Sequence, residues 1–414
     1  MDIQWSEFAQ RLGGPSGINE LMEDLGDALA RGGEDLVMMG GGNPAHIAAV
    51  EAVWRQRLGS ICADPVQLAA MLGDYDTPRG NAGFLETIAA YFAQTQGWPI
   101  SERNVAITPG SQTGAFLLFN ALASAQRPIG FPLVPEYIGY ADQLHAGHFV
   151  APRPLIETHH EHRFEYRCDF AAIEAQGPVA AIACSRPTNP SANVLGDAEV
   201  DRLSKLCRAR GSLLYLDNAY GLPFPGVVFG EHRLPAFAEH IVYSFSLSKV
   251  GLPNTRTGII VASEAVIERL SRMNAVVGLA NGTVGQAITA PLFADGTIDR
   301  LVREVVRPYY RQRCEHALAS LDAALAGLPY RVHEPQGAFF LWLWLPELRI
   351  SDHELYERLK RRGVIVVPGH YFFAGLEGDW LHRSRCLRIS YCQDPARIER
   401  GMAILGEEVR RASR

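Results

Sequence analysis

A short segment, SFSLSKVGLPNTRTG at residues 244–258, gathers hydroxyl groups, one amine and one guanidinium directly after an apolar run. An amine at the mouth of a buried site has its pKa lowered by desolvation and by nearby cations, and it can then form a Schiff base with a carbonyl compound. We therefore predict Lys249 as a nucleophile. Ser246 and Arg256 are predicted to hold a phosphate, the arginine through a two-pronged charged hydrogen bond. Taken alone, a serine–lysine segment is more often a solvated surface stretch.

A second apolar run ends in SLLYLDNAYG, where Tyr220 follows Asp217 by three residues. Judged alone, Asp217 fits the cap of a turn as well as a functional site. If a pyridine nitrogen lies opposite, the carboxylate keeps that nitrogen protonated, because opposite charges about 4 Å apart attract by roughly 4 kcal/mol at an effective dielectric near 20. The ring then becomes the electron sink that pyridoxal phosphate chemistry requires. Tyr220 and Asn189, the latter in RPTNPSAN, are candidates to hydrogen-bond the ring hydroxyl, although Asn-Pro also marks plain turns.

Three further segments carry candidate binding groups. TPGSQTGAFLLF predicts a helix that begins near Ser111 and Gln112, and the free N–H groups at a helix start bind phosphate. A simple helix cap would also explain Ser111. Tyr137 in PEYIGY is expected either to lie against a ring face or only to pack in a turn. Arg388 in CLRISY has apolar neighbours on both sides, so it is either half of an internal ion pair or a clamp for a substrate carboxylate.

The elements that must position these residues alternate between short apolar runs and helical patterns from about residue 100 to 262. Such alternation predicts a parallel or mixed sheet covered by helices on both faces. Ligands bind beyond the carboxyl ends of the strands in such sheets, and each cluster described above follows a predicted strand. After residue 295 the pattern changes to one long helix, then three strand-like and two more helical segments. We predict a second, α+β domain there, joined by the N-terminal segment.

The composition argues against several other classes of protein. A chain of 414 residues with 47% hydrophobic residues can bury a large core, and a net charge of -6 without a dense basic stripe argues against nucleic acid or an anionic membrane as partner. The seven cysteines are scattered without a C-x-x-C pair, which favours a reducing cytoplasm over disulfides or a zinc site. The sequence shows neither a leader pattern nor a membrane-length apolar run. The histidine-rich THHEHR lacks a metal-binding spacing and is interpreted as a solvated loop, so we predict no metal.

In their order along the chain, these motifs resemble the fold type I pyridoxal phosphate-dependent aminotransferases. The series YDTPRG, GSQ, PEY, NP, DNAY, SLSK with an arginine after it, PQGAFF, VVPG and a late arginine covers essentially the whole chain. The resemblance implies an α/β fold, in which a large domain with a mixed, mostly parallel seven-stranded sheet between helices is joined to a smaller α+β domain. Two residues depart from the usual family pattern, because Ala192 and Asn254 stand where glycine is common. Both restrict the backbone or alter the wall of the site.

The resemblance also implies a role for each candidate residue. Lys249 would form the aldimine with pyridoxal 5'-phosphate and move the Cα proton, and Asp217 and Tyr220 would act with it. The substrate contacts would be Arg388, Gly41 and Asn189. The cofactor contacts would be Ser111, Gln112, Tyr137, Asn189, Asp217, Tyr220, Ser246, Lys249 and Arg256, with Tyr75 contributed across the interface of a homodimer. The implied organisation is an N-terminal segment (1–48) packed with the small domain, a large cofactor-binding domain (49–298) and a C-terminal small domain (299–414).

The implied activity is a two-stage transamination with ping-pong kinetics, which moves an amino group from a small aliphatic L-amino acid to a 2-oxo acid. A narrower set of segments, including MMGGGNPA and SLSKVGLPNTRTGIIVA, resembles the branch of the family that acts on valine and pyruvate. We expect GGGN and Tyr140 to line its apolar pocket. Such a pocket separates substrates that differ by one methylene only roughly 10- to 200-fold, so leucine, 2-aminobutyrate and alanine stay candidates.

Two classes of alternative function remain open at this stage. One is a different reaction on the same cofactor, such as that of a lyase, decarboxylase or oxidase, or a pathway-specific aminotransferase. The other is a regulator that senses the cofactor. A regulator would carry a DNA-binding module ahead of GGGNP, which begins near residue 40, and we expect too little chain there for such a module.

Overall fold

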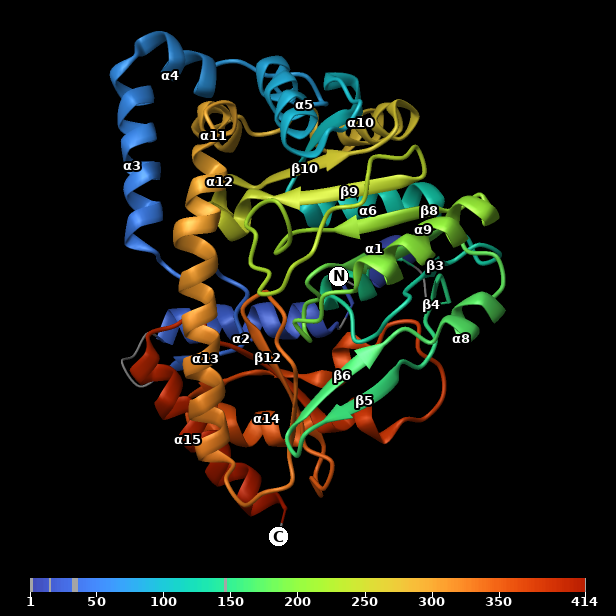
Figure 1. The fold of residues 1–414 in the computed structure, drawn as a ribbon, viewed down its shortest axis with the longest axis vertical. Helices are drawn as coiled ribbons and strands as arrows, with labels where there is room; N and C mark the ends of the chain where they lie inside the picture. The colour runs from blue at the N-terminus through green and yellow to red at the C-terminus, as the bar shows by residue number, and fades with distance from the viewer. Residues whose placement is uncertain (1–2, 15, 32–35, 145–146, 414) are drawn as a thin grey trace.

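The centre of the molecule is a seven-stranded sheet, seen in a computed structural model that describes residues 3–14, 16–31, 36–144 and 147–413 (Figure 1). Neighbouring strands are parallel except around β10, which is antiparallel to both of its neighbours. The prediction of a mixed, mostly parallel seven-stranded sheet is confirmed. In sheet order the strands are β2 (Val105–Pro109), β10 (Thr257–Val261), β9 (Ile241–Ser246), β8 (Leu213–Asp217), β7 (Ala181–Ser185), β3 (Ile129–Gly130) and β4 (Phe149–Val150).

The strands of this sheet form where the sequence has short, almost wholly apolar runs. Every residue of β7, β9 and β10 is buried, as expected for strands covered on both faces. Helix α6 packs against β2, β9 and β10, helix α9 against β7 and β8, and helix α10 against β2. The helices of this part of the chain are α3 (Ala48–Ala63), α4 (Pro65–Leu72), α5 (Ala82–Gln96), α6 (Ser111–Leu122), α7 (Ile138–Ala141), α8 (Phe170–Ala175), α9 (Asp197–Arg210), α10 (Glu264–Gly278) and α11 (Val284–Ala294).

A second sheet of six strands lies beside the C-terminal helices (Figure 1). Its members, in order, are β14 (Val367–Pro368), β15 (Cys386–Ser390), β12 (Phe340–Trp344), β11 (Arg331–His333), β6 (Arg163–Arg167) and β5 (Leu155–His159). The hairpin β5–β6 comes from the middle of the chain, and β6 pairs in parallel with β11. The predicted boundary at residue 298 therefore does not separate the two sheets completely, because this hairpin crosses from one to the other. The domain boundaries otherwise stay a prediction.

The N-terminal segment is tied to the C-terminal part of the chain. Strand β1 (Val37–Met38) pairs with β13 (Val364–Ile365). Before it, α2 (Gly17–Arg31) lies along α14 (Asp352–Arg361), where Asp24 accepts hydrogen bonds from Tyr356 and, at 2.5 Å, from Lys360. The pairing of β1 with β13 forms a separate two-stranded sheet, which anchors the N-terminal segment before the chain reaches the central sheet.

The single long helix predicted after residue 295 is interrupted. A π-helical turn, Val302–Val306, separates α12 (Thr297–Leu301) from α13 (Arg307–Ala324). Pro308 at the start of α13 has no N–H to donate, and a widened turn accommodates a proline within a continuing helix. Helix α15 (Pro395–Ala412) then packs along α13 (Figure 1).

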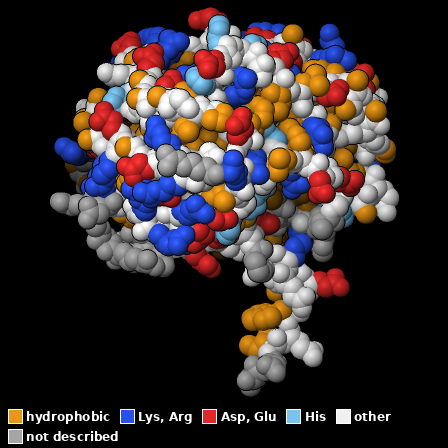
Figure 2. All heavy atoms as spheres, turned by 90° about the horizontal axis from the view of Figure 1, so that it is seen from below, with side chains coloured by type: hydrophobic (Ala, Val, Ile, Leu, Met, Phe, Trp, Pro, Cys, Tyr) orange, Lys and Arg blue, Asp and Glu red, His pale blue; other side chains and the backbone are white. Residues whose placement is uncertain are grey.

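The face of the molecule in Figure 2 carries charges of both signs with hydrophobic side chains among them. Figure 2 shows acidic and basic side chains interspersed over the face that it presents, and a narrow projection that stands out from a rounded body. Helix α1 (Glu7–Leu12) has no buried residue, and Ile3, Trp5 and Phe8 are exposed. None of the described helices combines the length and the apolar character needed to cross a bilayer.

Candidate active site

The carboxyl ends of β7, β8 and β9 meet at one cavity. Nine of the ten predicted cofactor contacts line it: Ser111, Gln112, Tyr137, Asn189, Asp217, Tyr220, Ser246, Lys249 and Arg256. The tenth, Tyr75, is 86% exposed and lies outside this cavity. Ser185, Ala219 and Ser248 also line it and were not predicted. Ser185 ends β7, and Ser248 lies on the turn directly before Lys249, so their places beside predicted residues were the available signal.

Lys249 stands on a single 3₁₀ turn, Leu247–Val250, that directly follows β9. The turn begins at Ser246, whose hydroxyl accepts from the Ser248 N–H at 3.2 Å, and ends at Gly251 in a left-handed conformation. Its Nζ donates to the Gly42 carbonyl at 2.7 Å. Burial lowers the pKa of Lys249 to about 8, so the neutral amine is far more populated near neutral pH than in an ordinary lysine.

Asp217 ends β8 and is buried. Its Oδ1 accepts from the Ala219 N–H at 2.9 Å, and its Oδ2 accepts from the Tyr140 hydroxyl at 2.5 Å. Burial raises the pKa of Asp217. The expectation that Tyr140 lines an apolar substrate pocket is wrong, because its side chain is buried behind Asp217 and is not among the residues that line the cavity.

The opposite end of the cavity is built for an anion. Helix α6 begins at Ser111, and Gly110 before it has a φ of +85°. A Cβ at position 110 would lie 2.1 Å from Nη2 of Arg256, so only glycine admits this guanidinium so close to the helix start. The alternative of Ser111 as a side-chain cap is wrong, since the cap position is Gly110. Among the described residues no carboxylate lies within ion-pair distance of Arg256.

Arg388 lies on β15, at the boundary between the two sheets. It is 2% exposed, its Nη1 donates to Asn189 Oδ1 at 2.8 Å, and its Nη2 donates to the Gly40 carbonyl at 2.6 Å. Its Nε has no partner, and in the described part of the chain no carboxylate pairs with it. Burial lowers the pKa of Arg388 to about 10. An internal ion pair is therefore excluded, and a buried cation left without an anion suits a ligand carboxylate.

The N-terminal glycines contact Arg388 and Lys249. Gly40 accepts from Arg388 and Gly42 accepts from Lys249, so the predicted Gly41 lies between the two contacts rather than making either of them. A further cavity of ≈ 260 Å³ adjoins Lys249 and includes Asn43, Ala45 and Asn254 in its wall. The segment after β1 thus forms part of the enclosure around the amine.

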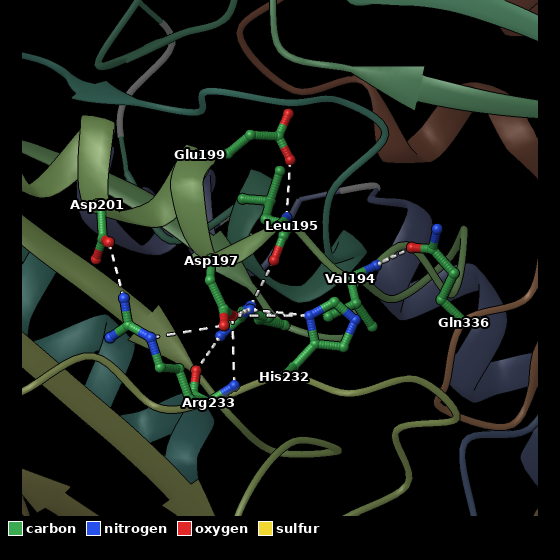
Figure 3. Close-up of polar contacts among 10 residues, drawn as sticks. Val194, Leu195, Asp197, Glu199, Asp201, His232, Arg233 and Gln336 are labelled. Atoms are coloured by element: carbon green, nitrogen blue, oxygen red, sulfur yellow. Dashed lines mark hydrogen bonds and ion pairs between the residues drawn. The ribbon is translucent and has the colours of Figure 1, made fainter.

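The loop that carries Asn189 is held by a buried cation. Arg186 donates to the Leu195 carbonyl at 2.7 Å, to the Arg233 carbonyl at 2.7 Å and to Asp197 at 2.6 Å. Figure 3 labels these three partners. At the far end of the loop, the Val194 N–H donates to Gln336 at 2.7 Å. Ala192, one of the two departures from the family pattern, has a φ of +61°, a conformation that glycine adopts more easily. The loop is therefore fixed at both ends while its middle is strained.

Glu136 is a functional neighbour that the sequence reasoning missed. It is 3% exposed, and it accepts from the Tyr137 N–H at 2.7 Å and from the Ser185 N–H at 2.9 Å, as well as from the Ser185 hydroxyl. Burial raises the pKa of Glu136 to about 7. Its contacts connect the Tyr137 segment to the end of β7. The only available signal was a glutamate between a proline and the predicted tyrosine, which is not distinctive.

Among the described residues, two groups of acidic and histidine side chains have atoms close enough to share an ion: Glu20 with His353 and Glu357, and Glu157 with His159 and Glu165. Arg167 pairs with both Glu157 and Glu165, and Lys360 lies 3.7 Å from Glu357. These cations compete for the same oxygens, so neither group is proposed as a metal site. His159 belongs to the THHEHR segment, which forms the turn of the β5–β6 hairpin.

Comparison with known proteins gives a consistent result. Residues 39–405 match the family described as aminotransferase class I and II. The chain is 41% identical to the valine–pyruvate aminotransferase of Escherichia coli K12 over 99% of both chains. Among solved structures, a putative amino-acid aminotransferase from Psychrobacter arcticum has a TM-score of 0.95 at 39% identity over 99% of both chains. A valine–pyruvate aminotransferase from Salmonella typhimurium has a TM-score of 0.88 at 41% identity, over 95% of this chain and 99% of that one.

Proposed function

The chain belongs to the class I and II aminotransferases, enzymes that depend on pyridoxal 5'-phosphate, and from this premise we propose that it moves an amino group from L-valine to pyruvate, giving 3-methyl-2-oxobutanoate and L-alanine. The observation that carries the choice of substrates is the 41% identity, over 99% of both chains, with a valine–pyruvate aminotransferase. Leucine, 2-aminobutyrate and alanine are proposed as further amino donors, because an apolar pocket separates them only weakly.

The cavity fits this cofactor at three points. Arg256, Ser111, Ser246 and Ser248 surround the start of α6, where free N–H groups and an unpaired guanidinium suit a phosphate. Asp217 at the other end suits a protonated pyridine nitrogen, and Asn189 and Tyr220 suit the ring oxygen. Tyr137 suits a ring face. The Lys249 amine lies on the same cavity wall as all of these groups. The cofactor roles of the individual residues are proposals.

The mechanism assigns one task to each group of the chain. Bound in this cavity, the cofactor supplies a conjugated electron sink for the carbon that bears the amino group. Arg388 binds the carboxylate of the amino acid, helped by its fixed contacts to Asn189 and Gly40. The neutral Lys249 amine removes the proton from Cα and returns one later, since its pKa of about 8 lies close to working pH. Asp217 holds a proton on the ring nitrogen. The second substrate uses the same groups in reverse order, which gives ping-pong kinetics.

The test is the visible absorbance of the protein loaded with pyridoxal phosphate during addition of L-valine and then pyruvate. We expect valine to convert the cofactor to its aminated form and pyruvate to restore it. In Lys249→Ala the rate of this conversion should fall by about 10²- to 10⁴-fold, because the proton carrier is lost. Lys205→Ala, a change at an exposed lysine on α9, is the matched control and should react like the unaltered protein.

Each negative outcome has a separate meaning. A band that responds to other amino acids but not to valine would reject the proposed substrate while keeping the reaction. A protein that binds the cofactor and consumes valine without needing a 2-oxo acid would point to a lyase, decarboxylase or oxidase instead. Equal rates for Lys249→Ala and Lys205→Ala would reject Lys249 as the proton carrier.

The assembly that we propose is a homodimer in which Tyr75 reaches the phosphate end of the partner's cavity. Tyr75 is 86% exposed, and Val66 and Leu72 before it are 77% and 66% exposed. The segment around Tyr75 is held to the end of α10 by hydrogen bonds from Asn274 and Asn281 to the Pro78 carbonyl, where Val276, Val277 and Leu279 are exposed as well. A set of large apolar side chains that monomeric proteins would bury favours contact with a second copy.

The compartment that we propose is the cytoplasm. All seven cysteines are free thiols, and five of them are buried. Thiols in this state are typical of proteins in a reducing compartment.

A further inference from the structure

The carboxylate of Asp217 depends on one neutral side chain for its second hydrogen bond. Its Oδ1 is held by the Ala219 N–H, 2.9 Å away, and its Oδ2 by the Tyr140 hydroxyl, 2.5 Å away. Among the described residues, no arginine, lysine or histidine lies within ion-pair distance of it. A buried carboxylate without a cation tends to become protonated unless hydrogen bonds stabilise its charge.

Tyr140 is held firmly behind Asp217. Its side chain is 1% exposed and is packed among aromatic rings, with centroids 5.3 Å away at Phe119, 5.1 Å at Tyr137 and 6.2 Å at Phe131. It lies three residues after Tyr137, and its backbone N–H donates to the Tyr137 carbonyl at 3.0 Å. One turn of chain therefore fixes Tyr140, behind Asp217, relative to Tyr137, on the cavity wall.

We infer that Tyr140 is a positioning residue, whose hydroxyl keeps Asp217 ionised and oriented so that the carboxylate faces the pyridine nitrogen of the cofactor. This inference rests on the proposed function, because it concerns the group that Asp217 would bind. The direction of the hydrogen bond follows from the environment: burial and the charge of Asp217 raise the pKa of Tyr140 well above its usual value, so the phenol stays the donor. A donor hydrogen bond lowers the free energy of the ionised carboxylate and opposes the effect of burial.

The test is Tyr140→Phe, which removes the hydroxyl and keeps the ring. Two properties are measured on protein loaded with ¹⁵N-labelled pyridoxal phosphate: the dissociation constant of the cofactor, and the ¹⁵N chemical shift of the pyridine nitrogen. We expect binding to weaken about tenfold or more, since a hydrogen bond to a charged group is lost. We expect the nitrogen signal to move from the protonated toward the unprotonated position. Neither property is an activity, so a slow reaction cannot mimic the result.

Tyr243→Phe is the matched control. Tyr243 is also a buried phenol, and it donates to the Ala236 carbonyl at 2.9 Å. Tyr243 lies on β9, one residue before Ser244, which pairs with Asp217. Its side chain therefore points to the face of the sheet opposite to that of Asp217. This variant should lose a similar amount of stability while leaving the cofactor affinity and the nitrogen signal unchanged.

A double-mutant cycle shows whether Tyr140 acts through Asp217. In an Asp217→Asn background, Tyr140→Phe should have no further effect on cofactor affinity, because the charge that it stabilises is gone. Additive losses would overturn the inference. So would an unaltered nitrogen signal in Tyr140→Phe, provided that the unaltered protein shows a protonated nitrogen. An unaltered protein that binds no cofactor would instead reject the proposed function, and the inference with it.

Discussion

At the scale of single residues, the site is defined by two cations with no acidic partner in the described chain. Arg256 and Arg388 lie at different ends of the enclosure, and each makes its contacts to carbonyl or amide or hydroxyl oxygens. Burying Arg388 without an anion costs free energy, which the fold offsets elsewhere. We propose that a substrate carboxylate recovers that cost on binding, and that the exposed Arg256 serves a phosphate.

Arg388→Lys tests the second of these assignments. A lysine keeps the charge but offers no planar fork, so it cannot serve Asn189, Gly40 and a carboxylate together. We expect the KM for L-valine to rise about tenfold or more, corresponding to one lost hydrogen bond between charged groups, with a smaller change in kcat. Steady-state kinetics at a fixed pyruvate concentration measure this. The affinity for pyridoxal phosphate is the internal control. A KM equal to that of the unaltered enzyme would show that the carboxylate binds elsewhere.

At the scale of elements, the sequence predicted what depends on local pattern and missed what depends on distant pairing. Asp217, Ser246 and Lys249 lie together because each stands at or just after the end of a strand. The apolar run before each of them predicts that strand from the sequence. The hairpin β5–β6 shows the limit, since nothing within residues 155–167 indicates that β6 pairs with β11 more than 150 residues later. Tyr140 shows the same limit for side chains, because its partner Asp217 is 77 residues away. The sequence around Tyr140 does not indicate which distant residue its hydroxyl contacts.

The turn of the β5–β6 hairpin permits a test of its local geometry. His160 has a φ of +54° and is exposed, and neither neighbour in the turn has a positive φ. His160→Gly should stabilise the protein by about 0.5 kcal/mol, because glycine adopts this conformation without strain and no buried surface is lost. Glu161→Gly, one residue later, gains no such relief and should destabilise by a similar amount. Melting temperatures of the two variants measured side by side should therefore move in opposite directions, and a fall in both would contradict the account.

At the scale of the whole molecule, the cavity and its enclosure are built from residues that lie far apart in the chain. The N-terminal segment supplies Gly40 and Gly42, the central sheet supplies Asp217 and Lys249, and β15 supplies Arg388. The resemblance to the family, and not any local pattern, assigned Tyr75 to a partner subunit. Its 86% exposure leaves its side chain available to a second subunit. An experiment on mixed subunits tests that assignment.

The experiment combines two parents that are impaired at limiting pyridoxal phosphate, Lys249→Ala and Tyr75→Ala, by co-expression. If Tyr75 acts across the interface, a mixed dimer contains one intact site, made from the Lys249 of one subunit and the Tyr75 of the other. We expect recovery of up to roughly one active site in four after random pairing into symmetric dimers, because half of the dimers are mixed and each has one working site. The measurement is valine–pyruvate activity at limiting pyridoxal phosphate, where loss of a phosphate contact is most visible. If each cavity uses its own Tyr75, the mixed dimer has no intact site, and activity stays at the average of the two parents. The cofactor-saturated Tyr75→Ala parent serves as the control for folding, since added pyridoxal phosphate should restore part of its activity while Lys249→Ala stays inactive.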